Sequence, residues 1–303
     1  MSQYRPQGIF TALVTPFTTS GELDLPTIKG LVDYQLSAGI HGLMTTGGSG
    51  EYVTLTDTER RRVLDAVLEA VGGQVPVMAG VLAPDTASAV ATTRAAKQAG
   101  AMAALVLTPY YVHPSLDGLY AHFARVAEVG LPILAYNNPG RTGINIGVDL
   151  LVRLITLEPV VGMKECDRDM GRVAEKLAAT AGRLSILAGD DDLLYPDVLL
   201  GSPGAIMAIS NLAPAICVAI YDALARGEVT RAREHFFDLL PLIFATRGPN
   251  HPGPLKQAHA LVGRPVGTGR LPLAPLTNEE LQARFEKPLH HLGLLRTDTV
   301  AVR

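Results

Sequence analysis

The sequence predicts an α/β protein, a closed (β/α)8 barrel with a C-terminal helical extension. Short apolar runs recur roughly every 20–30 residues, stretches with helical periodicity lie between them, and the alternation ends near residue 210. Parallel strands that are covered on both faces are apolar throughout, and strands alternating with helices build such sheets. A doubly wound open sheet shows the same periodicity and is the alternative fold.

Eight apolar runs supply the predicted strands, and several of them are β-branched and apolar throughout. This composition is typical of strands that are buried on both faces. In chain order the runs are Ile9–Val14, Gly42–Thr45, Val75–Gly80, Ala103–Thr108, Pro132–Tyr136, Val160–Met163, Leu184–Ala188 and Ala205–Ile209.

The stretches between these runs have the periodicity of amphipathic helices. Apolar residues recur at spacings of three and four within 28–36 and again within 63–71. The second stretch also has a start signal, because Thr56 and Glu59 have the spacing of a capping box. Weaker candidate caps are Asp85, Ser115 and Asp167.

The chain beyond the eighth run has a different character. Helices are expected over Ala215–Ala225, Arg231–Phe244 and Asn278–Leu292, and the stretch at 248–275 is rich in Pro and Gly. By length alone, 303 residues suit two domains, but a single α/β barrel reaches about 250 residues. We therefore expect a catalytic barrel over 1–211 and a C-terminal helical region over 212–303.

Composition and charge exclude several classes of function. The chain carries a net charge of −3 and lacks the basic excess of a general nucleic-acid binder. No apolar stretch approaches the ~20 residues of a membrane helix, and the first residues show no signal-peptide pattern. Two cysteines, Cys166 and Cys217, cannot form a disulfide framework. We expect a cytoplasmic protein without nucleic-acid or membrane partners.

The C-terminal ends of the strands carry the catalytic groups of a (β/α)8 barrel. Of six lysines, only Lys164 directly continues an apolar run, Val160–Met163. Desolvation there is expected to lower the pKa of the amine, which makes it a nucleophile toward a carbonyl carbon. The structural alternative is a lysine that reaches water or pairs with Glu165.

Tyr136 ends the fifth run, and a phenol can shuttle protons when another hydroxyl passes them onward. Ser49 and Tyr111 are the candidates for that relay; a buried aromatic plug and a turn serine are the structural alternatives. The glycine-rich loop at 47–50 can hold a carboxylate or phosphate on its backbone N–H groups. It is not a dinucleotide fingerprint, because Val53 occupies the third glycine position.

The other candidates follow later strands. Arg141 suits a carboxylate ligand, and Asp190–Asp192 suit a metal or a substrate hydroxyl, or else cap a helix. The histidines show no metal-ligand spacing, so we expect no metal. Cys166 is expected to be a small buried residue rather than a catalytic thiol. Substrate-binding roles are assigned to Gly48, Gly50, Arg141, Gly189, Asp191 and Ile206.

Five ordered motifs together resemble the dihydrodipicolinate synthase/N-acetylneuraminate lyase family of pyruvate-dependent class I aldolases, over about residues 8–295. They read Ala-Leu-Val-Thr-Pro-Phe at 12–17, Gly-x-Ser-Gly-Glu at 47–51, Thr-Pro-Tyr-Tyr at 108–111, Tyr-Asn-x-Pro-x-Arg-Thr-Gly at 136–143 and Gly-x-Lys-Glu at 162–165. The resemblance implies a barrel enzyme that acts on a keto acid and an aldehyde. It also implies a homotetramer or homodimer, and a covalent imine on Lys164 in place of any cofactor.

The resemblance carries individual roles to matching positions. Lys164 matches the Schiff-base lysine, and Tyr136 matches the proton-shuttling tyrosine. Ser49 matches the hydroxyl that contacts this tyrosine and the keto-acid carboxylate. Tyr111 matches a tyrosine that reaches into the neighbouring subunit's site. Arg141 matches the synthase arginine that binds the carboxyl group of the second substrate.

Some positions depart from the synthase pattern. Gly48 stands where the loop usually has its first threonine, so the usual hydroxyl relay between the two tyrosines is broken. The Gly-Gly-Ser-Gly-Glu loop is closer to that of sugar-acid dehydratases. The lysine feedback site also looks absent, since the expected histidines, asparagine and glutamate are replaced by Asp57, Arg60, Pro84 and Ser88.

Three hypotheses follow for the function. The first is a Schiff-base lyase like dihydrodipicolinate synthase, which joins pyruvate to aspartate semialdehyde. The second is a 2-keto-3-deoxy sugar-acid aldolase or dehydratase, or an N-acetylneuraminate lyase-like enzyme. The third is a non-catalytic barrel that binds keto acids, against which Lys164 and Tyr136 argue.

Overall fold

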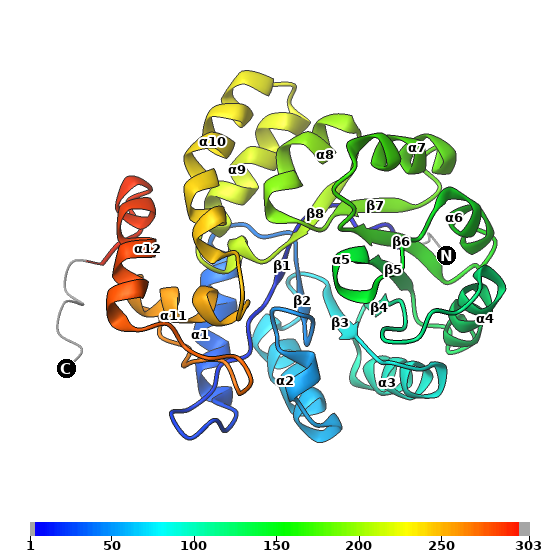
Figure 1. Ribbon diagram of the computed structural model, residues 1–303, viewed down its shortest axis with the longest axis horizontal. Helices are drawn as coiled ribbons and strands as arrows, with labels where there is room; N and C mark the ends of the chain where they lie inside the picture. Colours follow the sequence, from blue (N-terminus) through cyan, green and yellow to red (C-terminus); the bar gives the residue numbers. More distant parts are fainter. Residues whose placement is uncertain (1–3, 297–303) are drawn as a thin grey trace.

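The computed structural model describes residues 4–296. Its centre is a closed barrel of parallel strands in the order β1 to β8, with β8 paired to β1 (Figure 1). The strands are β1 (Gly8–Ala12), β2 (Gly42–Thr45), β3 (Val77–Val81), β4 (Ala103–Leu107), β5 (Ile133–Asn137), β6 (Val160–Glu165), β7 (Ser185–Ala188) and β8 (Gly204–Met207). The predicted barrel is confirmed, and the open doubly wound alternative is wrong.

All eight predicted strands are present, with small shifts at their ends. Strand β3 begins at Val77 rather than Val75; Pro76, which lacks an N–H group, precedes it. Strand β6 extends beyond Met163 to Glu165, because Lys164 and Glu165 pair with both neighbouring strands. Lys164 is therefore part of the barrel wall.

Helices surround the barrel, and a short helical turn, α5, follows β5. Those of the barrel portion are α1 (Leu25–Ser37), α2 (Asp57–Val71), α3 (Thr86–Ala99), α4 (Leu116–Ala127), α5 (Pro139–Thr142), α6 (Val148–Leu154), α7 (Met170–Thr180) and α8 (Leu194–Leu200). Short 3-10 turns are η1 (Tyr52–Thr54), η2 (Asp191–Leu193) and η3 (Ile209–Asn211).

The start signals in the sequence are mostly confirmed. Thr56 and Glu59 form the predicted capping box of α2. The side chains of Asp85 and Ser115 cap α3 and α4. Asp167 is not a cap, because the side chain of Asp169 caps α7 instead.

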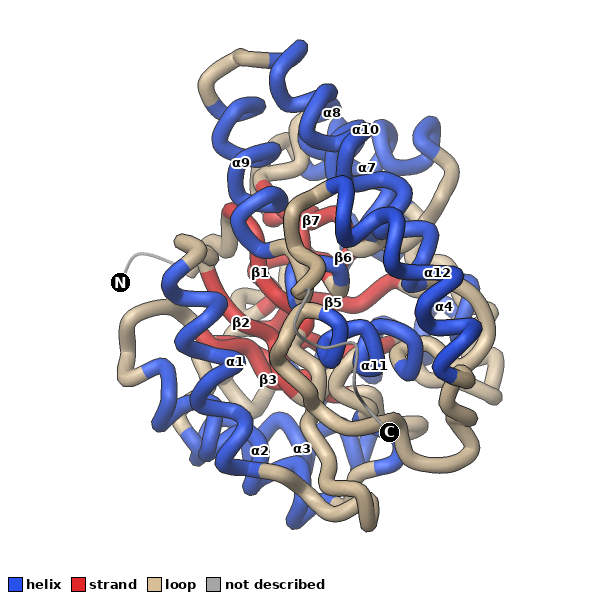
Figure 2. The backbone as a smooth tube through the Cα atoms, turned by 90° about the vertical axis from the view of Figure 1, so that its left-hand side faces the viewer, coloured by secondary structure: helices blue, strands red, loops and turns tan. Residues whose placement is uncertain are grey.

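The C-terminal region forms α9 (Pro214–Ala225), α10 (Val229–Thr246), α11 (Gly253–Leu261) and α12 (Asn278–His291). Helix α11 lies inside the Pro/Gly-rich stretch, and its prolines occupy first-turn positions that need no N–H donor. Helices α9 to α12 gather on one flank of the barrel, near α1 (Figures 1 and 2). The boundary between 1–211 and 212–303 remains a proposal.

Two apolar clusters fill the molecule. One lies between the strands and the surrounding helices, and the other fills the barrel interior. Phe10, Met44, Met78, Leu134 and Ile206 belong to the interior cluster and are almost fully buried. This packing closes the inside of the barrel, so any ligand must bind at its mouth.

Candidate active site

A cavity of about 620 Å³ opens beyond the C-terminal ends of the strands. Its wall contains Lys164 and Tyr136 from the barrel, Gly48 and Ser49 from the loop after β2, and Arg141 from α5. Residues of the C-terminal region complete the wall. These five sequence-predicted candidates therefore converge on one site.

Lys164 and Tyr136 lie side by side on adjacent strands, in direct register. The Lys164 Nζ atom is 4.7 Å from the centre of the Tyr136 ring, and both side chains are buried. Among the described residues, Lys164 Nζ has no hydrogen-bond or ion-pair partner. The amine is thus held near the phenol and is free to react with a ligand in the cavity.

The charge state of Lys164 differs from the sequence-based expectation. Burial opposes the ammonium, but the pull of Tyr136, Cys166 and Asp190 outweighs it and raises the pKa of Lys164 above its usual value. The predicted lowering of this pKa by desolvation is therefore wrong. Lys164 rests as an ammonium at neutral pH and must lose a proton before it attacks a carbonyl group.

Tyr136 is the nearest group that can exchange a proton with Lys164. Burial raises the pKa of its phenol, while Lys164 and a hydrogen bond from Asn138 act in the opposite direction. The Asn138 Nδ2 atom donates to Tyr136 Oη over 2.9 Å. Ser49 makes no hydrogen bond to this phenol, so the predicted hydroxyl relay is not formed within this chain.

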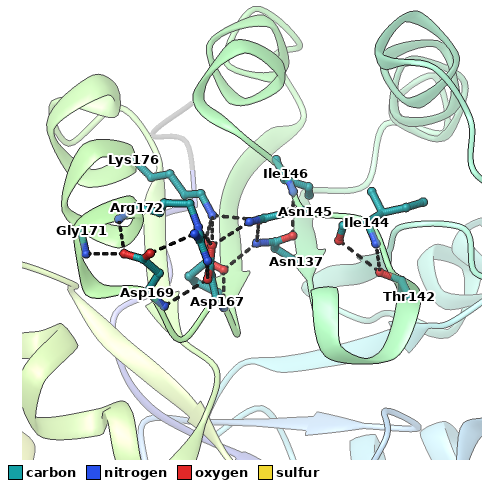
Figure 3. A network of polar contacts seen from close by, with 11 residues as sticks. Asn137, Thr142, Ile144, Asn145, Ile146, Asp167, Asp169, Gly171, Arg172 and Lys176 are labelled. Atoms are coloured by element: carbon teal, nitrogen blue, oxygen red, sulfur yellow. Dashed lines mark hydrogen bonds and ion pairs between the residues drawn. The ribbon is translucent and has the colours of Figure 1, made fainter.

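A polar network behind the barrel wall supports this pair of strands. Asn137 and Glu165 follow the two site residues, and Asn137 Nδ2 donates to Glu165 Oε1 over 2.6 Å. Lys176, from α7, donates to the other Glu165 oxygen over 2.7 Å. Figure 3 shows Asn145, Asp167 and Arg172 extending the network along α7. These bonds join the two strands directly beside Lys164 and Tyr136.

The loop at 47–50 is arranged to receive an anion. Within residues 4–296, the N–H groups of Ser49 and Gly50 have no hydrogen-bond acceptor, and Ser49 is buried. Gly50 is tightly enclosed, since a Cβ there would approach Leu13 and Thr46 backbone atoms to 3.0–3.1 Å. Gly48 faces open space instead. The free N–H groups fit a carboxylate.

Glu51 anchors this loop to the C-terminal region. Its Oε1 accepts a 2.7 Å hydrogen bond from Lys256, and its Oε2 accepts the N–H of Arg270 over 2.9 Å. Both Glu51 and Lys256 are almost fully buried. Burial lowers the pKa of Lys256 to about 8, although Glu51 opposes this shift. The shape of the loop therefore depends on residues more than 200 positions away.

Arg141 is exposed at the mouth of the cavity, and its guanidinium group has no hydrogen-bond or ion-pair partner among the described residues. Two other arginines in the wall are already paired. Arg168 bonds Asp190 and Asp192, and Arg247 bonds Asp192. Arg141 is thus the wall arginine with a free guanidinium group for a ligand carboxylate.

Tyr111 lies outside the cavity of its own chain. Its side chain is 95% exposed, and its backbone has a φ of 74°, which is rare for a residue with a side chain. Tyr110, its neighbour, lines the cavity instead. The structure thus places Tyr111 on the surface and not beside Tyr136.

Gly189 and Asp191 follow β7. A Cβ on Gly189 would come within 2.4 Å of the Cys166 sulfur, so only glycine fits there. Asp191 accepts the N–H groups of Ala208 and Ile209 over 2.8 and 3.1 Å, and burial raises its pKa to about 6. Both line the cavity, whereas Ile206 is not among the residues that do, and its substrate-binding role stays a prediction.

The cavity lining also includes polar residues that were not singled out in the sequence, among them Asn138, Arg168, Arg247 and His251. Burial lowers the pKa of His251 to about 4, so its imidazole is neutral at physiological pH. The described residues contain no group of three side chains that could hold a metal ion, and no helix among them could span a membrane.

Comparison with known proteins yields consistent matches. The model of the dihydrodipicolinate synthetase family matches residues 5–291. A 4-hydroxy-tetrahydrodipicolinate synthase of Thermomicrobium roseum is 39% identical, over 95% of this chain and 97% of that protein. A dihydrodipicolinate synthase structure from Thermotoga maritima has a TM-score of 0.92 at 34% identity, covering 96% of this chain and all of that one. An Acinetobacter baumannii synthase, solved with pyruvate, has a TM-score of 0.92 at 31% identity, covering 95% and 99%.

Proposed function

This chain belongs to the dihydrodipicolinate synthetase family, and we propose that it is a 4-hydroxy-tetrahydrodipicolinate synthase that joins pyruvate to aspartate semialdehyde. The observation that supports this most directly is the buried pair of Lys164 and Tyr136 beside the unpaired Arg141. The chemistry is that of a class I aldolase-type lyase. The covalent imine takes the place of any cofactor.

The first half-reaction uses pyruvate alone. Lys164, once deprotonated, adds to the C2 carbonyl carbon, and Tyr136 gives a proton to the hydroxyl that leaves as water. The resulting iminium draws electrons from C3, which loses a proton and becomes an enamine. The N–H groups of Ser49 and Gly50 hold the pyruvate carboxylate during these steps.

The second half-reaction forms the new carbon–carbon bond. Enamine C3 adds to the aldehyde carbon, and the aldehyde oxygen takes up a proton from Tyr136. Arg141 binds the carboxylate of the aldehyde and so directs its carbonyl group toward C3. The amino group of the aldehyde substrate then attacks the imine carbon, which closes the product ring and displaces Lys164 as the free amine. Gly48, Gly189 and Asp191 are assigned to the wall that shapes this second subsite.

A second candidate reaction is the aldol cleavage or dehydration of 2-keto-3-deoxy sugar acids. It is favoured by the open space at Gly48 and by the polar wall that contains Asp190, Arg168 and His251. A polyhydroxylated substrate needs more room and more hydrogen-bonding groups than an aldehyde of four carbons. The same Schiff base serves both reactions.

We also propose that the protein is a cytoplasmic homodimer or homotetramer. Tyr111 is 95% exposed, and the apolar residues Val112, next to it in the chain, and Val53, after the loop at 47–50, are 52% and 70% exposed. A second copy of the chain covering this surface would bring Tyr111 toward the partner's cavity. We further propose that the chain divides into a barrel over 1–211 and a helical region over 212–303, because the alternation of strands and helices ends near residue 210.

The decisive experiment traps the imine. The protein is treated with pyruvate and borohydride, and mass spectrometry is expected to find the adduct on Lys164. Lys164→Ala should trap nothing and lose activity at least 1,000-fold, whereas Lys29→Ala, at an exposed lysine, should behave as the parent. Absence of an adduct in the folded parent at millimolar pyruvate would support the non-catalytic keto-acid binder.

The reaction itself is identified by substrate comparison. Condensation with aspartate semialdehyde is compared with turnover of 2-keto-3-deoxy acids. Gly48→Thr fits the open space and should raise synthase activity if the missing hydroxyl limits the rate. Faster turnover of the sugar acids than of aspartate semialdehyde would favour the second candidate.

A further inference from the structure

The phenol of Tyr136 has a single hydrogen-bond partner among the described residues, and that partner has no role in the proposed reaction. It is Asn138, whose Nδ2 lies 2.9 Å from Tyr136 Oη. We infer that Asn138 is a positioning residue, whose amide fixes the phenol oxygen and directs the phenol O–H toward the cavity. This inference rests on the proposed function, because it concerns the proton transfers assigned to Tyr136.

The start of α5 leaves the Asn138 side chain free for this bond. Asn138 occupies the position before the helix, where an asparagine side chain ordinarily accepts an N–H group of the first turn. Here the side chain makes no such bond. The Asn138 backbone carbonyl accepts the N–H groups of Arg141 and Thr142 instead, both over 3.0 Å. The amide is thereby released from capping and is free to reach Tyr136.

No hydroxyl group from the other predicted relay positions reaches the phenol of Tyr136. Gly48, which lines the same cavity, has no side chain to offer, and Ser49 makes no hydrogen bond to Tyr136. Tyr111 points outward and is 95% exposed. No hydroxyl of the described chain therefore holds the phenol, and the amide of Asn138 performs this task alone.

The amide of Asn138 also limits the groups with which Tyr136 can exchange a proton. An amide N–H donates a hydrogen bond but does not give up its proton at neutral pH. Asn138 therefore ends the chain of hydrogen bonds, and Tyr136 can exchange protons only with groups in the cavity. A donor also stabilises the phenolate that forms when Tyr136 protonates a leaving hydroxyl or an aldehyde oxygen. The proton given in one step must return from the substrate or from the Lys164 nitrogen.

The test separates imine formation from proton transfer. Exchange of the pyruvate methyl protons for deuterium, followed by NMR across a pH series, needs no aldehyde and reports on enamine formation. Borohydride trapping reports the imine. Asn138→Leu removes the donor at similar volume, and we expect it still to form the adduct but to exchange about tenfold more slowly. The pH midpoint of exchange should rise by roughly half to one unit, as the phenolate loses its donor.

A second variant tests the direction of the hydrogen bond. Asn138→Asp has the same shape but presents an anionic acceptor where the donor stood. We expect an exchange rate at or below that of Asn138→Leu. If Asn138→Asp keeps the parent rate, the phenol is the donor of this bond, and the proposed positioning is wrong. Thermal unfolding of both variants checks that each one folds.

The outcomes for the two proposals are distinct. An unchanged exchange rate and an unchanged pH midpoint in Asn138→Leu, with the adduct intact, would overturn the role of Asn138 alone. A slower rate with an unmoved pH midpoint would indicate a merely structural residue and would also overturn it. A parent protein that traps no pyruvate would overturn the proposed function together with the role built upon it.

Discussion

At the scale of single residues, the reactivity of Lys164 is set by a proton. Its pKa is raised by Tyr136 and by other nearby groups despite burial, so only a small fraction is free amine at neutral pH. As long as the pH is below the pKa of Lys164, each increase of one pH unit raises the fraction of free amine about tenfold. We therefore expect the initial rate of pyruvate imine formation, measured by rapid borohydride trapping, to rise steeply from pH 6 to pH 8.

A lowered pKa of Lys164 would give a different pH dependence of the trapping rate. If desolvation controlled Lys164 and lowered its pKa below neutrality, the trapping rate would be level over this range. Lys29→Ala, at an exposed lysine, provides the control, because it leaves the surroundings of Lys164 unchanged. Its trapping rate should follow that of the parent at every pH.

Arg141 allows a second prediction at this scale. Its guanidinium is unpaired among the described residues and faces the cavity, so replacement should weaken binding of the aldehyde carboxylate and leave pyruvate unaffected. A charge-assisted hydrogen bond contributes about 2 kcal/mol, or roughly 30-fold. Arg141→Ala should raise the KM for aspartate semialdehyde by about that factor.

The comparison variant is Arg153→Ala, at an arginine that pairs with Asp117 on the outer surface. It should keep both KM values. An Arg141→Ala enzyme that loses affinity for pyruvate as well would assign Arg141 to the first subsite instead.

At the scale of elements, the alignment of β5 and β6 depends on a buried charge. Lys176 is 1% exposed and lies 2.7 Å from Glu165, with Asp167 at 3.5 Å. Removing the cation leaves buried carboxylate charge uncompensated, which costs about 3–5 kcal/mol. In urea unfolding, Lys176→Met should lower the free energy of unfolding by this amount.

Arg61→Met is the matched control, because Arg61 and its partner Asp65 are 44% and 48% exposed. Its effect should be much smaller. A double variant, Lys176→Met with Glu165→Met, should recover part of the stability by removing the uncompensated charge. Equal stability losses in Lys176→Met and Arg61→Met would contradict a buried-charge origin.

The elements also show what the sequence can and cannot predict. The strands were predictable because each is buried on both faces and therefore apolar. The caps Thr56, Asp85 and Ser115 were predictable because capping is a local interaction. Asp167 was misassigned because its carboxylate instead bonds Asn145 and Arg172, contacts that depend on how β6 and α7 pack.

At the scale of the whole molecule, the site belongs to both parts of the chain. Glu51, which follows the loop at 47–50, bonds Lys256, and Arg270 bonds Glu59 over 2.5 Å. Lys164 and Tyr136 could be singled out because each continues an apolar run, and the ordered motifs around them predicted their roles. Arg247 and His251 could not, since only the packing of the C-terminal region against the barrel brings them to the cavity.

Asp197, on α8, gives the whole fold a pH-dependent stability. It is fully buried, and its carboxylate oxygens have no hydrogen-bond partner among the described residues. Burial, aided by the negative charges of Glu165, Asp190 and Asp192, raises its pKa from 3.8 to about 7. Between these two values the folded state binds more protons than the unfolded state, so the free energy of unfolding falls as pH rises. Above about pH 7 the decrease in the free energy of unfolding is complete and amounts to about 4 kcal/mol.

Asp197→Asn tests this by removing the titration. Its free energy of unfolding in urea should exceed that of the parent at pH 8, and the advantage should shrink steadily toward pH 5, because the parent carboxyl becomes neutral there. Asp33→Asn, at a half-exposed carboxylate on α1, should follow the parent's slope. Parallel pH profiles for Asp197→Asn and the parent would mean that Asp197 is ionised in the folded protein throughout this range, and the fall in stability would then have to arise elsewhere.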